Sequence, residues 1–75
     1  MNYIVVASEK KTGEKKWIAH GVWKRIMTAR GYANRWNDYA EEHPRQRFNA
    51  DYMVIALPEG MKPTVINIEK FVETL

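Results

Sequence analysis

The residue types that perform catalysis are few in this chain and lie apart in the sequence. His20 and His43 are the only histidines, and no group of carboxylates stands beside either of them. Ser8 is the only serine, and cysteine is absent. Nucleophilic catalysis needs a nucleophile with a positioned base, and a zinc site needs three or four clustered ligands. We therefore expect neither an enzyme nor a metal or cofactor site.

Basic residues are concentrated in the first half of the sequence. Residues 1–35 contain eight Lys or Arg and two Glu, a net charge of +6. Residues 36–75 contain four Lys or Arg and seven Asp or Glu, a net charge of −3. A basic surface with interleaved aromatic residues is typical of proteins that bind nucleic acid without reading its sequence. The candidates for such contacts are Lys10, Lys11, Lys15, Lys16, Arg30 and Arg35. The alternative is that these residues form a solvated hairpin tip and a solvated helix face.

Three tryptophans in 75 residues are more aromatic surface than so small a core readily buries. Trp36 falls on the apolar stripe of a predicted helix, so we expect it in the core. An exposed tryptophan is a common anchor of protein interfaces. We predict Trp23 as the anchor of a partner-binding surface, with Lys24 and Arg25 as its charged rim and Trp17 as a second contact. Partial burial of the two tryptophans is the alternative.

Apolar runs with β-branched residues predict three strands. Residues 3–7 and 52–57 are apolar on both faces, which is typical of buried strands. Between residues 8 and 16 the chain is polar, and Thr12-Gly13 supplies the positive φ that a hairpin turn needs. We therefore predict a hairpin of residues 2–8 and 15–20, and a third strand at 52–57.

Helical spacing predicts two further elements. An apolar stripe with steps of three or four residues runs through Val22, Ile26, Ala29, Ala33, Trp36 and Ala40. It indicates a main helix over residues 28–42, with Thr28 as its N-cap and His43-Pro44 as its end. Residues 21–27 are open to interpretation as a strand extension, a loop or a short helix. At the C-terminus an amphipathic helix follows Asn67 as N-cap, although a short strand at 64–68 competes with it.

These elements predict one α+β domain that covers residues 1–75. The order is β-β-α-β, with a three-stranded antiparallel sheet in spatial order 2-1-3 packed on one main helix, followed by a C-terminal amphipathic segment. So small a core is marginally stable, and self-association is one remedy. The apolar face of the last segment predicts a homodimer, unless it packs on its own sheet; this face consists of Ile68, Phe71, Val72 and Leu75.

The absence of a signal-like segment, a membrane-length apolar run and cysteine favours a cytoplasmic protein with no membrane partner.

The pattern of a Thr12-Gly13-Glu14 turn, a Trp36-bearing helix that ends before His43-Pro44 and an apolar strand resembles short phage- and prophage-encoded proteins of unknown function. The resemblance spans residues 3–57 and implies no activity or site residue. It favours a small accessory or host-interacting protein. The small size, the surplus tryptophan and the opposite charges of the two halves predict a non-catalytic module that binds a protein partner, with nucleic-acid binding as the alternative.

Overall fold

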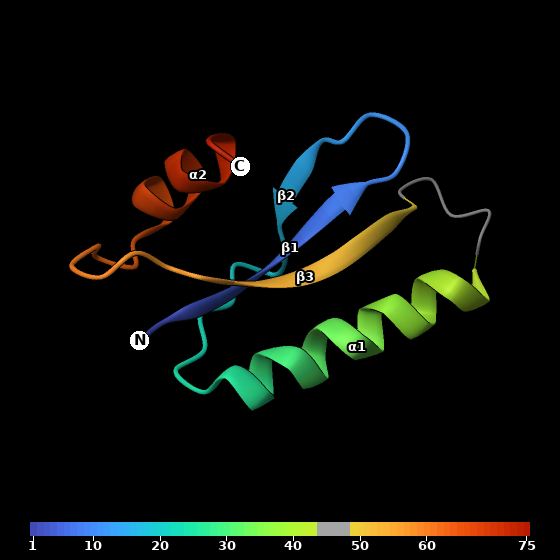
Figure 1. The fold of residues 1–75 in the computed structure, drawn as a ribbon, viewed down its shortest axis with the longest axis horizontal. Coiled ribbons are helices and arrows are strands. Elements are labelled where there is room, and N and C mark those ends of the chain that lie inside the picture. The colour runs from blue at the N-terminus through green and yellow to red at the C-terminus, as the bar shows by residue number, and fades with distance from the viewer. Residues whose placement is uncertain (44–48) are drawn as a thin grey trace.

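The computed structural model describes residues 1–43 and 49–75. Its elements follow in the order β1 (Tyr3–Glu9), β2 (Lys15–Trp17), α1 (Ile26–Glu42), β3 (Ala50–Ala56) and α2 (Val65–Glu73). The three strands are antiparallel and lie in the order β2-β1-β3 (Figure 1). The predicted α+β class and strand order are therefore confirmed.

The sheet is covered by a helix on each face. Side chains of a strand alternate between the two faces of a sheet. Accordingly, Ile4 and Val6 of β1 pack with residues of α2, whereas Val5 packs with residues of α1. Figure 1 shows the sheet between the two helices. The two-faced apolar character of β1 thus has a second cause besides its central position, namely the C-terminal helix on the far face.

Strand β2 ends at Trp17, earlier than the predicted residue 20, because the chain turns away from the sheet. Ala19 and His20 both have left-handed backbone angles, with φ of 57° and 50°, and the Gly21 amide donates to the Ile18 carbonyl at 3.4 Å. Two consecutive left-handed residues form the tight turn that the mirror-image hairpin types use. A regular strand cannot continue through this geometry.

The segment after this turn is a loop that touches the sheet once. Trp23 exchanges two backbone hydrogen bonds with Tyr3, at 2.7 and 2.9 Å. The indole of Trp23 lies over Gly21, where an added Cβ would come within 2.4 Å of the ring. Glycine at position 21 therefore lets the ring approach the backbone. Of the three interpretations of residues 21–27, a loop followed by the start of α1 is correct.

Both predicted helix N-caps are wrong by a few residues. Helix α1 begins at Ile26, so Thr28 lies inside it, and Arg25 occupies the N-cap position without a side-chain cap. Helix α2 begins at Val65 because the Thr64 hydroxyl accepts the Asn67 amide at 3.2 Å. The competing strand at 64–68 does not form. The predicted stop of α1 holds at its last residue, Glu42, while Pro44 lies outside the described residues.

The apolar face of α2 packs on the chain's own sheet. Ile68 and Val72 are buried, Phe71 is half-buried and Leu75 is 42% exposed. Two of the four residues predicted to form a homodimer are therefore already covered within one chain. Packing on the chain's own sheet, one of the two sequence-based alternatives, is observed for Ile68 and Val72, and the homodimer stays a prediction. Over residues 1–43 and 49–75, no helix combines the length and the apolar character needed to cross a bilayer.

Candidate functional site

Strand β3 lies at the edge of the sheet, and within residues 1–43 and 49–75 part of its backbone has no partner strand. Tyr3 and Val5 of β1 lie opposite Ala56 and Val54. Tyr3 directs its backbone groups away from β3, to Trp23, and the Val5 carbonyl accepts the Ile18 amide. In an antiparallel pair, opposite residues either bond each other or both point away. The N–H and C=O groups of Val54 and Ala56 therefore point outward, and we call these four groups the open edge.

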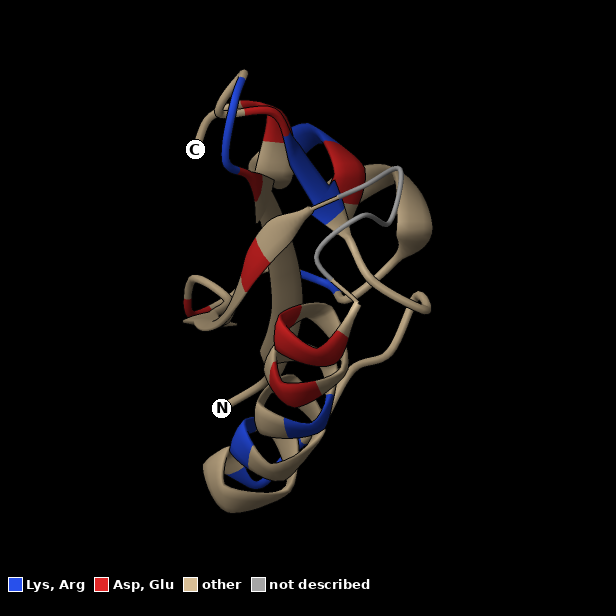
Figure 2. Cartoon of the chain, turned by 90° about the vertical axis from the view of Figure 1, so that its right-hand side faces the viewer, with Lys and Arg blue, Asp and Glu red and all other residues tan. Residues whose placement is uncertain are grey.

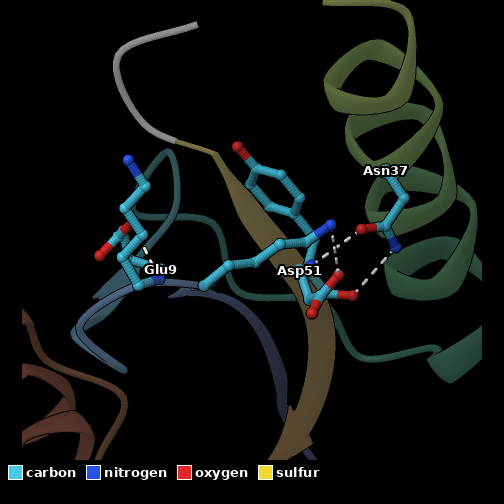
Figure 3. Close-up of polar contacts among 6 residues, drawn as sticks. Glu9, Asn37 and Asp51 are labelled. Carbon is cyan, nitrogen blue, oxygen red and sulfur yellow. Dashed lines mark hydrogen bonds and ion pairs between the residues drawn. The ribbon is translucent and has the colours of Figure 1, made fainter. Parts of the chain in front are cut away.

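One end of this edge is closed by a side chain of α1. The Asn37 Oδ1 accepts the Tyr52 amide at 2.8 Å, and the Asn37 Nδ2 donates to the Tyr52 carbonyl at 3.1 Å (Figure 3). A carboxamide carries the same donor and acceptor as a peptide unit, so Asn37 takes the place of a neighbouring strand at this residue. The open edge consequently begins after Tyr52.

A shallow groove runs beside the open edge, between β3 and the first half of α1. Its volume is about 330 Å³, and we call it the α1–β3 groove. It is lined by Ile26, Arg30, Ala33, Asn34, Tyr52 and Val54. The small side chains of the buried Ala29 and Ala33 allow α1 to approach the sheet closely. The groove thus combines apolar walls, one cationic side chain and an adjacent row of free backbone groups.

The charges of α1 are segregated along its length. Arg25 and Arg30 lie at or near its beginning and Arg35 lies just past its middle, whereas Asp38, Glu41 and Glu42 lie near its end (Figure 2). This order opposes the helix dipole, which favours acidic residues at the N-terminus and basic residues at the C-terminus. The arrangement therefore does not stabilise the helix through its dipole, and it places Arg30 beside the α1–β3 groove.

Arg30 is the cation that lines this groove. Its side chain is exposed, and within the described residues no carboxylate lies at ion-pair distance from it. The ion pair formed elsewhere, between Lys10 Nζ and Asp51 Oδ1 at 3.7 Å, is on the far side of the Asn37 contact. Arg30 is therefore available to an anionic group in the groove.

The two tryptophans predicted to bind a partner lie on opposite faces of the sheet. Trp23 is half-buried on the α1 face, with its ring centroid 5.0 Å from that of Tyr32. Trp17 packs on the α2 face and donates its indole N–H to the Gly21 carbonyl at 3.1 Å. They pack in different clusters, although both contact Gly21. The predicted rim residues Lys24 and Arg25 are exposed and immediately precede Ile26, which lines the α1–β3 groove.

The six residues considered for nucleic-acid binding fall into two groups. Lys10, Lys11, Lys15 and Lys16 lie on the β1–β2 hairpin, whereas Arg30 and Arg35 lie on α1. Five helical positions separate Arg30 from Arg35, which turns them about 140° apart around the axis. The acidic end of α1 lies towards the hairpin, since Glu41 and Lys10 border the same hollow. These residues do not form a single basic track on the described surface.

Sequence reasoning missed Asn37, Ile26 and Val54. Asn37 carried one usable signal: it is a polar residue four positions after Ala33, on the apolar stripe of the helix.

In the described part of the chain, no three His, Asp or Glu residues gather as a metal site would require. No family model, no curated protein and no solved structure matches the chain.

Proposed function

We propose that this protein is a non-catalytic protein-binding module that receives an extended segment of a partner as an additional strand on β3. The observation that carries the proposal is the open edge beside the α1–β3 groove. Peptides that add to a sheet edge gain affinity from main-chain hydrogen bonds and specificity from pockets for alternate side chains. Here the open edge supplies the main-chain groups, and the adjacent α1–β3 groove supplies a pocket for side chains.

The two edges of the sheet differ in how they are protected. Strand β2 has only three residues and carries Lys15 and Lys16, and short, lysine-bearing edges resist pairing with other chains. Strand β3 has seven residues, and its only charged residue, Asp51, lies before the Asn37 contact. The segment from Val54 to Ala56 has no lysine or proline to oppose an added strand. This contrast favours β3 as the binding edge.

Backbone bonds alone are too few to make a stable complex. The open edge offers four groups, and a hydrogen bond contributes about 0.5–1.5 kcal/mol net. Their sum of roughly 2–6 kcal/mol is below the approximately 8 kcal/mol of a micromolar complex, before the entropic cost of association. Side chains of the partner must therefore contribute through the α1–β3 groove.

The test is a substitution that removes one outward donor without touching the core. Ala56 is exposed and its N–H points outward, so Ala56→Pro removes no bond to β1, and Ile55 before it is already extended. Ala56→Thr is the matched control, because it adds bulk and keeps the N–H. We expect wild type and Ala56→Thr to capture a partner from a lysate of the cells whose genome encodes this protein, and Ala56→Pro to lose that partner.

A second measurement in the same complex locates the contact. The amide hydrogens of Val54 and Ala56 should exchange rapidly in the free protein and become protected when the partner is bound. Full capture by a folded Ala56→Pro variant, or recovery of nucleic acid instead of protein, would reject the proposal.

The surface around Trp23 is the competing binding surface. Trp23 contributes to the packing of the α1 face, so its truncation to alanine also lowers stability. Lys24→Ala with Arg25→Ala removes the rim charges and leaves this packing unchanged, because both side chains are exposed. If this double variant and a folded Trp23→Phe variant lose the partner while Ala56→Pro retains it, the binding surface is at Trp23.

A further inference from the structure

We infer that the segment bound on β3 is acidic and places a carboxylate side chain against Arg30, with an apolar side chain against Ile26. This inference rests on the proposed function and specifies the chemistry of the partner. It follows from which face of the sheet the added side chains occupy, from the order of the groove residues along β3, and from the unpaired charge of Arg30.

The face is determined by Val54. This residue packs with Val5, Ala29 and Ala33 on the α1 face of the sheet. Residues directly opposite one another in neighbouring antiparallel strands project to the same face. Ala56 is two positions further and shares the face of Val54. The two partner residues that pair with Val54 and Ala56 consequently point their side chains towards α1.

The order of contacts is determined by the direction of α1. Asn37, in the second half of α1, bonds Tyr52 near the start of β3, whereas Ile26 and Arg30, in the first half, border the groove at Val54. Helix α1 therefore runs opposite to β3, and Ile26 lies further towards Ala56 than Arg30 does. The partner residue opposite Val54 meets Arg30, and the residue opposite Ala56 meets Ile26.

We take the added strand to run antiparallel to β3, because antiparallel pairing is slightly more stable per residue than parallel pairing. An antiparallel neighbour exchanges two bonds with each outward residue, so two partner residues satisfy all four groups of the open edge. An antiparallel segment meets Ala56 first and Val54 second. The pattern recognised is therefore an apolar residue, any residue, then Asp or Glu. The segment leaves the sheet after the acidic residue, because Asn37 already occupies Tyr52.

Neighbouring charges favour the same partner. Lys24 and Arg25 are exposed beside Ile26, and the acidic residues of α1 lie beyond the Asn37 contact. Exposed charges of this kind mainly raise the association rate and are screened by salt. Binding should therefore weaken as salt is added, most of all through a slower association.

The experiment is selection from a display library of random internal peptides, which carry no free C-terminus at the binding position. We expect wild-type protein to enrich the apolar-x-acidic pattern. An acetylated and amidated peptide of the selected sequence is then compared with its Glu→Gln counterpart by fluorescence anisotropy. The loss of a charged hydrogen bond predicts about tenfold weaker binding for the Gln peptide.

Charge reversal at one helix position supplies the decisive comparison. Arg30→Glu should weaken the acidic peptide by at least tenfold and should select a basic residue at that position instead. Arg35→Glu is the matched control, since it makes the same charge change on the same helix about 140° away from Arg30. If both variants weaken binding equally, the effect is general electrostatics and the pairing with Arg30 is wrong.

The remaining outcomes separate this inference from the proposed function. If Arg30→Glu leaves peptide binding unchanged while Ala56→Pro abolishes it, the acidic preference is refuted and strand addition on β3 stands. The preference for an acidic side chain is also refuted if a peptide with a free C-terminal carboxylate and no Asp or Glu binds equally well. Arg30 would then bind a chain terminus. If no selected peptide responds to Ala56→Pro, strand addition itself is refuted.

Discussion

The ionised side chain of Glu9 stabilises the turn between β1 and β2. Its carboxylate accepts the Thr12 hydroxyl and the backbone amides of Lys11 and Thr12, the latter two at 3.1 and 2.8 Å. These bonds, that of the Thr12 side chain first, lower the pKa of Glu9 below its ordinary value of 4.5. The carboxylate thereby holds the hairpin turn in which Gly13 has a φ of 74°.

This contact predicts how stability depends on pH. Because the pKa is lower in the folded state, the contribution of Glu9 is fully present above pH 4.5 and is lost as pH falls through the folded-state pKa. Glu9→Gln should therefore show a smaller decrease in melting temperature on acidification than wild type. Circular dichroism melts across this range measure it, with Glu14→Gln in the same loop as the charge-matched control. Parallel acid profiles for all three proteins would contradict the assignment.

At the scale of elements, the main polar link between α1 and the sheet is the Asn37–Tyr52 contact. It joins residues 15 positions apart and satisfies both backbone groups of Tyr52. Ring packing of Tyr52 on Trp36, with centroids 5.5 Å apart, holds the same two elements together. The contact therefore has two effects: it fixes α1 against β3, and it limits the length of the open edge.

We predict that Asn37→Ala lowers the free energy of unfolding by about 1–3 kcal/mol, because it leaves two half-buried backbone groups unpaired. Asn37→Asp should also destabilise, because it keeps the acceptor for the Tyr52 amide but opposes the Tyr52 carbonyl with a second acceptor. Chemical denaturation measures both, and Asn34→Ala, an exposed position one turn earlier, serves as the control. A loss for Asn37→Ala no larger than that of the control would show that the contact contributes little.

At the scale of the whole molecule, two small clusters share one thin sheet. Ile4, Val6, Leu57, Ile68 and Val72 form the buried cluster under α2, and Val5, Ala29 and Ala33 form the one under α1. A domain of this size has only about 3–5 kcal/mol of stability to lose. Each buried residue of α2 therefore matters to the single chain, whatever its oligomeric state.

The packing of α2 predicts a stability change that is independent of protein concentration. Ile68→Val should lower the free energy of unfolding by about 0.5–1.5 kcal/mol, and its melting temperature should not vary with concentration. Ile66→Val, at a position that is 65% exposed, is the matched control and should change little. A melting temperature that rises with concentration in wild type, and less so in Ile68→Val, would support the homodimer instead.

Element type, and the central place of the most apolar strand, follow from local patterns in the sequence. The apolar runs at 3–7 and 52–57, the Thr12-Gly13 turn and the helical spacing from Ile26 to Ala40 each act over a few residues, so they predict strands, turn and helix without tertiary information. The sequence also predicted Arg30 as a nucleic-acid contact and Lys24 and Arg25 as charges beside Trp23, and these roles stay predictions.

The open edge, the Asn37 contact and the packing of Trp23 were decided only by the tertiary structure. Whether the Val54 amide points to β1 or to solvent depends on its register with Val5, and whether Asn37 reaches Tyr52 depends on where α1 crosses β3. Both are relations between segments far apart in the chain, which no local periodicity encodes. A shift of one residue in that register would exchange bonded and open positions, because hydrogen bonding in an antiparallel strand alternates with every residue.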